Sequence, residues 1–330
     1  MKTKTFTFII IALSVIGCSK EKDFTTQVNG QNNSAATVTT DNIPINDLGT
    51  GKFKGYTGGL YPNGQNDASG MYAIDLFQTC HNITPLDTFG NPSPQKGKVL
   101  FISMGWSTCA QNMRALQAKT TGNPLTNPKL LLLTCNNGAG TARVNNIMNP
   151  NDPYWKLVAK DLRDANSSFR QVQIIYLETE DSSKNTSFPG RPLEVKNDLQ
   201  SCFRVFEQKF PNIKLVYLLA RTTTFGNHDH IFNLEPCPYY FGWACKWAIE
   251  DQINGVEGTA YKGANKVSPM ITWGFYQWAT STPRITDGFK WTADLTQDGM
   301  HANDAGRDTL STRFQNFLLT DKYAKNWYGK

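Results

Sequence analysis

Short apolar runs alternate along most of the chain with longer stretches that mix polar and apolar residues. The apolar runs occupy residues 99–103, 129–134, 172–177, 213–219 and 269–273. Runs of this length that are almost entirely apolar are typical of strands covered on both faces, as in a parallel sheet. The remaining stretches predict helices over residues 108–119, 153–164, 191–209, 239–253 and 303–319.

This order of elements predicts the fold class. Strands that alternate with helices, joined by right-handed crossovers, form a parallel sheet with helices on both faces. We therefore expect an α/β fold, a three-layer α/β/α sandwich with a parallel sheet of about five strands. The apolar residues of the 191–209 stretch fall near one helical stripe: Leu193, Val195, Leu199, Phe203 and Phe206. Ligands of such sheets bind at the carboxyl ends of the strands.

The first 43 residues differ in composition from the rest of the chain. In MKTKTFTFIIIALSVIGC, two lysines precede an apolar run that is too short to span a bilayer, as in a secretory signal. Val15-Ile16-Gly17-Cys18 resembles a bacterial lipobox, in which cleavage precedes a cysteine that receives a lipid. The alternative is an ordinary signal peptide with an incidental cysteine. Residues 19–43 are polar, which is typical of a disordered tether.

These features predict the domain organisation and the location. Residues 1–17 are the expected lipoprotein signal peptide, and residues 18–43 the lipidated cysteine and its tether. Residues 44–330 are expected to form a single domain, because no linker-like break or internal repeat follows position 50. The protein would then be exported and anchored by the lipid on Cys18 to a bacterial membrane, for which we expect the outer membrane.

Charge and cysteine content narrow the range of partners. The formal net charge is +6, and it falls to about +4 when Lys2 and Lys4 leave with the signal. The basic residues are dispersed among acidic ones, which argues against nucleic acid as a partner. Six cysteines follow Cys18. In an oxidising compartment some pairing is expected, with Cys237–Cys245 closing a short loop as the favoured pair. None has the spacing of metal ligands, so we expect no metal or other cofactor.

Two strand ends carry motifs suited to nucleophilic chemistry. Gly105-Trp106-Ser107-Thr108 follows the first strand and precedes a helix, where a backbone N–H stabilises developing negative charge. A serine in this position is more often a helix cap than a nucleophile. The second strand ends in Thr134-Cys-Asn-Asn-Gly-Ala-Gly140. Its glycines allow close approach to a substrate oxygen, but they suit a tight loop equally well.

Asp298-Gly-Met-His301 is the strongest local signal. A serine hydroxyl becomes a good nucleophile when a histidine takes its proton. A carboxylate on the other ring nitrogen holds the tautomer and stabilises the imidazolium. One tight glycine turn can supply both groups, and the helix that follows would fix this turn. The alternative is two polar residues in an ordinary turn.

The order of these motifs resembles that of the SGNH (GDSL-type) hydrolases: GWS after the first strand, a glycine loop after the second, and DGMH before the last helix. The resemblance implies a flavodoxin-like fold and ester hydrolysis by Ser107 as nucleophile, His301 as base and Asp298 as its orienter. It also implies an oxyanion hole of backbone N–H groups from Ser107, Gly138 and Gly140. FPNIKLVYLLART, EPCPYYFGWACKWAIEDQI, ITWGFYQWA and DGFKW are similar to a divergent bacterial subgroup, so the resemblance covers roughly residues 95–328.

The chain departs from the family pattern at two places. Trp106 stands where the GDS motif has aspartate, which leaves the chemistry of the serine intact. The third strand ends in Tyr176-Leu-Glu-Thr-Glu-Asp181, without the family's Gly-x-Asn-Asp, whose asparagine supplies an oxyanion donor. Asn185 and Arg221 are the alternative donors. Loss of one donor typically lowers the rate by about 10²–10³. Ser103 is the alternative nucleophile if the strand register differs.

Two further groups are candidates for binding. His228-Asp229-His230 has ligand-type side chains, but adjacent residues rarely reach one ion, and a polar surface loop is the simpler interpretation. Four residues near strand ends could line a pocket together with aromatic side chains, a combination suited to sugars: Arg221, Glu235, Lys246 and Trp278. Core packing and structural ion pairs are the alternative for these four.

The sequence thus supports two functions. The first is a lipid-anchored serine esterase that acts on ester groups, such as O-acetyl groups of glycans, through Ser107, His301 and Asp298. The second is a non-catalytic glycan-binding lipoprotein on the same fold, which the missing asparagine favours.

Overall fold

Five parallel strands form one sheet in the structure, a computed structural model that describes residues 42–135 and 141–330. All of these residues belong to one unit, Ala35–Lys330. The strands are β3 (Val99–Gly105), β4 (Leu130–Thr134), β5 (Val172–Glu178), β6 (Leu215–Leu218) and β7 (Met270–Trp273). They pair in the order β4-β3-β5-β6-β7. Counted from β3, this is the 2-1-3-4-5 order of flavodoxin-like folds, so the predicted fold class is confirmed.

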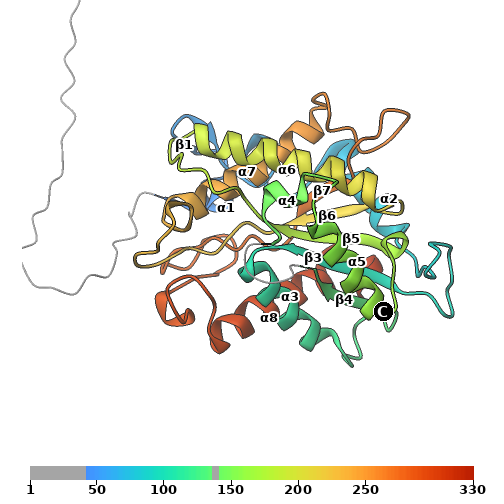
Figure 1. The fold of residues 1–330 in the computed structure, drawn as a ribbon. Helices are drawn as coiled ribbons and strands as arrows, with labels where there is room; N and C mark the ends of the chain where they lie inside the picture. The colour runs from blue at the N-terminus through green and yellow to red at the C-terminus, as the bar shows by residue number, and fades with distance from the viewer. Residues whose placement is uncertain (1–41, 136–140) are drawn as a thin grey trace, which may run out of the picture. The chain divides into compact units, whose positions relative to one another are not determined.

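Helices cover both faces of the sheet, as Figure 1 shows. The helices are α3 (Ser107–Thr120), α5 (Tyr154–Asp164), α6 (Gly190–Lys209), α7 (Cys237–Ile253) and α8 (Asp304–Thr320). α3 and α8 pack side by side on one face, and α6 and α7 pack side by side on the other. Each of the five agrees with a predicted helix to within about two residues at either end.

Several elements lie outside this alternating pattern. The segment before β3 contains α1 (Ile45–Leu48), the hairpin of β1 (Lys52–Phe53) and β2 (Tyr56–Thr57), and α2 (Gly70–His81). The short helix α4 (Val144–Ile147) precedes α5, and the short helix α9 (Lys325–Tyr328) is the last element of the chain. Four 3₁₀ turns complete the set: η1 (Pro62–Gly64), η2 (Phe169–Gln171), η3 (Ile231–Asn233) and η4 (Ala293–Leu295). No helix in the described ranges has the length and apolar character that crossing a membrane requires.

Two sequence-based expectations about α6 and α7 are wrong. Leu193 is 40% exposed, whereas the other residues of the predicted stripe on α6 are buried. The six cysteines after Cys18 are all unpaired and buried. Cys237 and Cys245 both lie in α7, eight residues apart, so the helical rise alone separates them by about 12 Å. A disulfide needs a Cα separation below about 7 Å, and the expected loop between them does not exist.

The expected signal peptide, Cys18 and the expected tether up to residue 41 lie outside the described residues, as do Gly138 and Gly140. Asn42, which the sequence assigned to the tether, is buried against the domain.

Candidate active site

Ser107 is the first residue of α3, immediately after β3 ends. Gly105 allows this sharp turn: its φ is +152°, and a Cβ there would lie 2.1 Å from the carbonyl oxygen of Glu178 in β5. The backbone N–H of Trp106 donates to that same carbonyl at 3.1 Å. Trp106 takes the N-cap position of α3, so Ser107 is not the cap. Ser107 therefore lies at the carboxyl edge of the sheet, among the N–H groups of a helix start that lack intrahelical partners.

Ser107, His301 and Asp298 form a continuous hydrogen-bonded chain. Ser107 Oγ lies 2.7 Å from His301 Nε2, and His301 Nδ1 lies 2.6 Å from Asp298 Oδ2. Partial burial opposes ionisation of Asp298, but hydrogen bonds from His301 and Met300 outweigh it and hold the pKa of this carboxyl below its ordinary value. An ionised carboxylate can only accept, so Nδ1 is the protonated nitrogen and Nε2 is free to accept the Ser107 hydroxyl proton.

The turn that carries Asp298 and His301 is fixed on both sides. Gly299 has a φ of +85°, and a Cβ there would lie 2.1 Å from the carbonyl oxygen of Phe225. Phe225 N–H donates to the Gly299 carbonyl at 2.8 Å, and Gly299 N–H donates to the Thr296 hydroxyl at 3.0 Å. After the turn, the Asn303 side chain caps α8 by accepting from Gly306 N–H at 2.9 Å. The turn is therefore held against the segment after β6.

A buried carboxyl group supports the start of α3. Glu178, at the end of β5, accepts hydrogen bonds from the hydroxyls of Thr108 and Tyr176. Burial raises the pKa of Glu178, and these two hydrogen bonds only partly offset the effect. Asn112 of α3 also donates to the Tyr176 hydroxyl, at 3.3 Å. This network braces the helix turn that presents Ser107. In the sequence, Glu178-Thr-Glu-Asp181 shows that acidic residues cluster at the end of β5. The sequence does not show that the Glu178 side chain contacts α3.

A cavity of about 510 Å³ opens beside Ser107. Its apolar lining includes Trp106, Ile231, Phe232 and Met300, and its basic side chains are Arg143, Lys184 and Arg221. In the described part of the chain, Arg143 and Lys184 form no ion pair, whereas Asp229 supplies one carboxylate to the same lining. A cavity of this size and mixed lining is typical of a small-molecule site.

Arg221 lies at this cavity, but protein groups occupy most of its hydrogen-bonding capacity. Its side chain is buried and pairs with Glu180. It donates to the Phe232 carbonyl at 2.9 Å and to Asn233 Oδ1 at 2.8 Å. The guanidinium also lies 5.2 Å from the ring centre of Trp106, a cation–π distance. Arg221 therefore holds the residue before Ser107 in place.

The other three residues considered for sugar contact do not line this cavity. Trp278 is buried and donates to Glu235 at 3.0 Å. Burial raises the pKa of Glu235 to about 7, although the hydrogen bond from Trp278 acts in the opposite direction. Lys246 is buried in α7, where it pairs with Glu250 and donates to a backbone carbonyl. These three side chains have the alternative role of core residues whose polar ends contact protein groups, although Glu235 Oε2 has no hydrogen-bond partner among the described residues.

The remaining sequence candidates are separate from the hydrogen-bonded chain. Ser103 is fully buried within β3. The Asn185 side chain donates to Glu194 at 2.8 Å, so it is held away from the role of an oxyanion donor. His228 lies 3.1 Å from the Phe225 carbonyl. Within residues 42–135 and 141–330, no group of three or more His, Cys, Asp or Glu side chains could hold a metal ion.

Comparisons with known proteins add little to this geometry. No protein-family model matches the chain, and no curated protein matches it significantly. A crystal structure from Parabacteroides merdae, described as a GDSL-like lipase, aligns with 66% of this chain and 94% of its own. The two are 11% identical, with a TM-score of 0.31. A similarity this low carries no argument, so the fold rests on the strand order and the site on its distances.

Proposed function

We propose that the protein is a serine ester hydrolase in which Ser107 is the nucleophile, His301 the general base and Asp298 the residue that orients the base. The observation that carries the proposal is the chain of hydrogen bonds of 2.7 and 2.6 Å from Ser107 to Asp298, at the edge of a cavity. Three such groups in series are the arrangement that activates a serine hydroxyl at neutral pH.

The geometry supports a two-step reaction. As Ser107 Oγ attacks the ester carbonyl carbon, His301 Nε2 takes its proton, and the carbonyl oxygen becomes an oxyanion near the N–H of Ser107. Collapse of this intermediate breaks the bond to the alcohol, which receives the proton from His301. Water then attacks the carbonyl carbon of the acyl-serine while His301 takes its proton. The bond from this carbon to Ser107 Oγ breaks, Oγ receives the proton from His301, and the acid leaves. Asp298 stays ionised throughout and stabilises the imidazolium.

Only part of the proposed oxyanion hole lies within the described residues. Ser107 N–H is one donor, at the start of a helix of 14 residues. Gly138 and Gly140, the other proposed donors, lie outside the described residues. The segment after β5 has no asparagine at the family's position, and Glu178 and Glu180 there are committed to Thr108 and to arginines. We therefore expect modest rates, with activated esters as the best substrates.

The proposed substrate is an acyl ester, such as an O-acetyl group, on a glycan of the cell envelope. The location follows from the lipobox-like Val15-Ile16-Gly17-Cys18, and the glycan from that location. The second candidate function is a glycan-binding lipoprotein without turnover, which the missing asparagine favours.

Hydrolysis of p-nitrophenyl acetate by the full chain distinguishes the two functions. The esterase is supported if the unmodified protein turns over, if Ser107→Ala abolishes turnover, and if the rate of Ser103→Ala stays within about twofold of the unmodified rate. Ser103 is the matched control because it is a serine of the same strand–helix unit, but its side chain is buried in β3. Absence of turnover in the unmodified protein would favour the binding function, and loss only in Ser103→Ala would move the nucleophile.

A further inference from the structure

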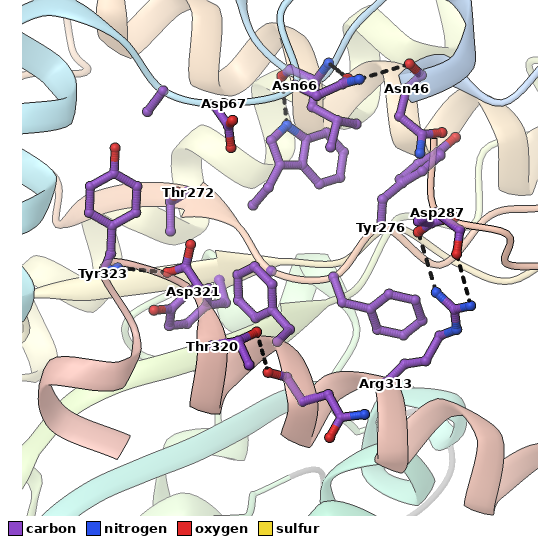
Figure 2. A pocket seen from close by; sticks show the side chains of 18 of the residues that line it. Asn46, Asn66, Asp67, Thr272, Tyr276, Asp287, Arg313, Thr320, Asp321 and Tyr323 are labelled. Carbon is purple, nitrogen blue, oxygen red and sulfur yellow. Dashed lines mark hydrogen bonds and ion pairs between the residues drawn. The ribbon is translucent and has the colours of Figure 1, made fainter. Parts of the chain in front are cut away.

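A second cavity, of about 640 Å³, shares no lining residue with the cavity beside Ser107. Figure 2 shows this cavity and the polar side chains around it. Three segments form most of its walls: residues 60–68, residues 272–276 at the end of β7, and the second half of α8 with residues 321–323. Asn46, Tyr217, Arg284 and Asp287 complete the lining. Thr312 is the first α8 residue in its lining, about 12 Å along the helix axis from Asp304. The cavity is therefore a separate site.

Two carboxylates face this cavity with unused accepting capacity. Asp67 is exposed and makes no hydrogen bond or ion pair within the described ranges. One oxygen of Asp321 accepts the N–H groups of Tyr323 (3.0 Å) and Ala324 (2.8 Å), and its other oxygen has no partner among the described residues. In Figure 2 the two carboxylates point into the same space from different walls. They can accept hydrogen bonds from a ligand.

Unused groups that donate as well as accept line the α8 wall. The side chains of Asn316 and Thr312 have no hydrogen-bond partner in the part of the chain that the structure describes. Near the opposite wall, Asn46 is 94% buried, and its Oδ1 has no partner there. An amide and a hydroxyl complement carboxylates that only accept. The ligand must therefore both donate and accept hydrogen bonds.

The charges around the cavity nearly cancel. Asp287 is held by Arg284 at 2.9 Å and lies 3.4 Å from Arg313. The excess negative charge of Asp67 and Asp321 is partly balanced by Lys322, next to Asp321 in the chain, whose ammonium lies 5.0 Å from the ring centre of Tyr323. An anionic ligand would meet the carboxylates of Asp67 and Asp321, whereas both guanidinium groups of the described lining, Arg284 and Arg313, contact Asp287. The balance favours a neutral ligand.

The apolar part of the lining is mostly aromatic. Tyr61, Trp273, Phe317 and Tyr323 contribute ring surface between the polar groups. Aromatic rings pack against the C–H faces of sugar rings, while the hydroxyl groups of a sugar both donate and accept. The cavity volume is also within the range of about 300–1,000 Å³ that small-molecule sites occupy.

From this combination we infer that the cavity between residues 60–68, the end of β7 and the second half of α8 binds a short neutral oligosaccharide. The sugar hydroxyls donate to Asp67 and Asp321 and exchange hydrogen bonds with Asn316. The inference is independent of the chemistry at Ser107, since the two cavities have separate linings. It gives the molecule a means of holding a glycan at a distance from the proposed hydrolytic site.

Isothermal titration calorimetry on the full chain tests this inference, with xylotriose, cellotriose and N-acetylated chitotriose as the neutral probes. We expect at least one of them to bind with a Kd between about 10 μM and 1 mM. Asp67→Asn and Asn316→Ala should each weaken that binding at least about fivefold, because each removes a proposed ligand contact and no side-chain hydrogen bond or ion pair within the described residues. Asp294→Asn is the matched control, an exposed aspartate outside both cavities, and should bind as the unmodified protein does.

Thermal melts that coincide for all four proteins ensure that the comparison concerns binding. The inference is overturned if none of the three oligosaccharides binds at about 10 mM, or if binding is the same in Asp67→Asn and Asn316→Ala as in Asp294→Asn. It is also overturned if spermidine, an organic cation, binds through Asp67 and the oligosaccharides do not. If Phe232→Ala abolishes binding and Asp67→Asn does not, the sugar binds in the cavity beside Ser107, and the inference is also overturned.

Discussion

The carboxylate of Asp298 uses its two oxygens for different partners. Oδ2 accepts from His301 Nδ1, and Oδ1 accepts the backbone N–H groups of Met300 (3.0 Å) and His301 (2.7 Å). An asparagine here has a single oxygen, which the two backbone donors would retain, so its NH₂ would face the imidazole. The ring would then keep Nδ1 unprotonated and Nε2 protonated, which is the tautomer that cannot take the Ser107 proton.

Asp298→Asn should therefore lower kcat on p-nitrophenyl acetate by about 10²–10⁴ without loss of folding. His301→Ala should be at least as damaging, because the base itself is removed. Adding Ser107→Ala to either change should have little further effect, since residues that act as one unit are not additive. Steady-state kinetics and thermal melts on the single and double variants measure both points. Activity within about threefold of the unmodified protein in His301→Ala would exclude His301 as the base.

Glu235 gives the folded state a dependence on pH. Burial raises its pKa to about 7, above the ordinary value of 4.5, so the folded state holds this proton more tightly than the unfolded state does. The resulting stability is fully present below about pH 4.5 and is lost as the pH rises through 7. The shift corresponds to about 3 kcal/mol as an order of magnitude. Asp198, whose pKa burial raises to about 6, acts in the same direction at lower pH.

We expect the urea midpoint to be lower at pH 8 than at pH 5, and Glu235→Gln to reduce this difference, because the amide cannot ionise. Glu257→Gln is the matched control, since Glu257 is exposed and makes no ion pair within the described part of the chain. If the difference between the urea midpoints at pH 5 and pH 8 is the same in Glu235→Gln and Glu257→Gln, Glu235 is not the source of the pH dependence.

At the scale of elements, two glycines determine how the site is assembled. Gly105 lets β3 pass into α3 against the carbonyl of Glu178, and Gly299 lets the Asp298–His301 turn pack against Phe225. Both have positive φ, and both would place a Cβ within 2.1 Å of a backbone oxygen. Gly105 thus positions Ser107, and Gly299 positions His301.

Gly299→Ala should lower kcat/KM at least about tenfold while the protein stays folded, because the added Cβ displaces the turn from Phe225. Gly263→Ala is the matched control. Gly263 has a φ of +76°, close to the +85° of Gly299, but nothing lies within 4 Å of a Cβ there. Each change should destabilise the fold by about 1–2 kcal/mol through backbone strain alone. Equal kcat/KM for the two variants would show that the contact with Phe225 does not position His301.

The strands and the main helices could be predicted because each buried strand of the sheet is a nearly continuous apolar run. α2 was missed, since Met71, Ile74 and Phe77 on its outer side are exposed and obscure the helical period. The disulfide prediction failed because α7 begins at Cys237, two residues before the predicted start at residue 239. Both cysteines therefore lie in one continuous helix, which keeps them too far apart to pair.

The proximity of Ser107 to His301 could be anticipated from the strand-end rule and from the order of the motifs. The partners of Glu178 and Glu180 could not be, because they depend on side chains from α3, α6 and the segment after β6 meeting in three dimensions. Arg221 shows the same limit. Its position near a strand end indicated the cavity, but its partners Glu180 and Asn233 are set by tertiary packing.

At the scale of the whole molecule, the strand order brings together groups that are distant in sequence. Ser107 follows β3, Arg221 follows β6, and His301 precedes α8, and all three meet at one edge of the sheet. The segment before β3 closes a different cavity beside β7 and the second half of α8. A hydrolytic site and a separate glycan site on one chain would suit an enzyme that works on an extended glycan at a membrane surface.

The proposed lipid anchor predicts that Cys18→Ser yields protein that is exported but recovered in the soluble fraction. Its activity on p-nitrophenyl acetate should equal that of the unmodified protein, because every residue proposed for catalysis lies between positions 107 and 301. Fractionation of cells with a high-salt wash, followed by the ester assay, measures both outcomes. A Cys18→Ser protein that stays with the membrane after the wash would refute lipidation at this residue.

Covalent trapping of the nucleophile tests the esterase account most directly. We expect diethyl p-nitrophenyl phosphate to release one p-nitrophenol per chain and to leave a diethylphosphoryl group on Ser107, identified by tandem mass spectrometry of the digested protein. His301→Ala should form this adduct at least about 10²-fold more slowly, since no base then takes the serine proton. No adduct, an adduct on another residue such as Ser103, or equal labelling rates with and without His301 would contradict the account.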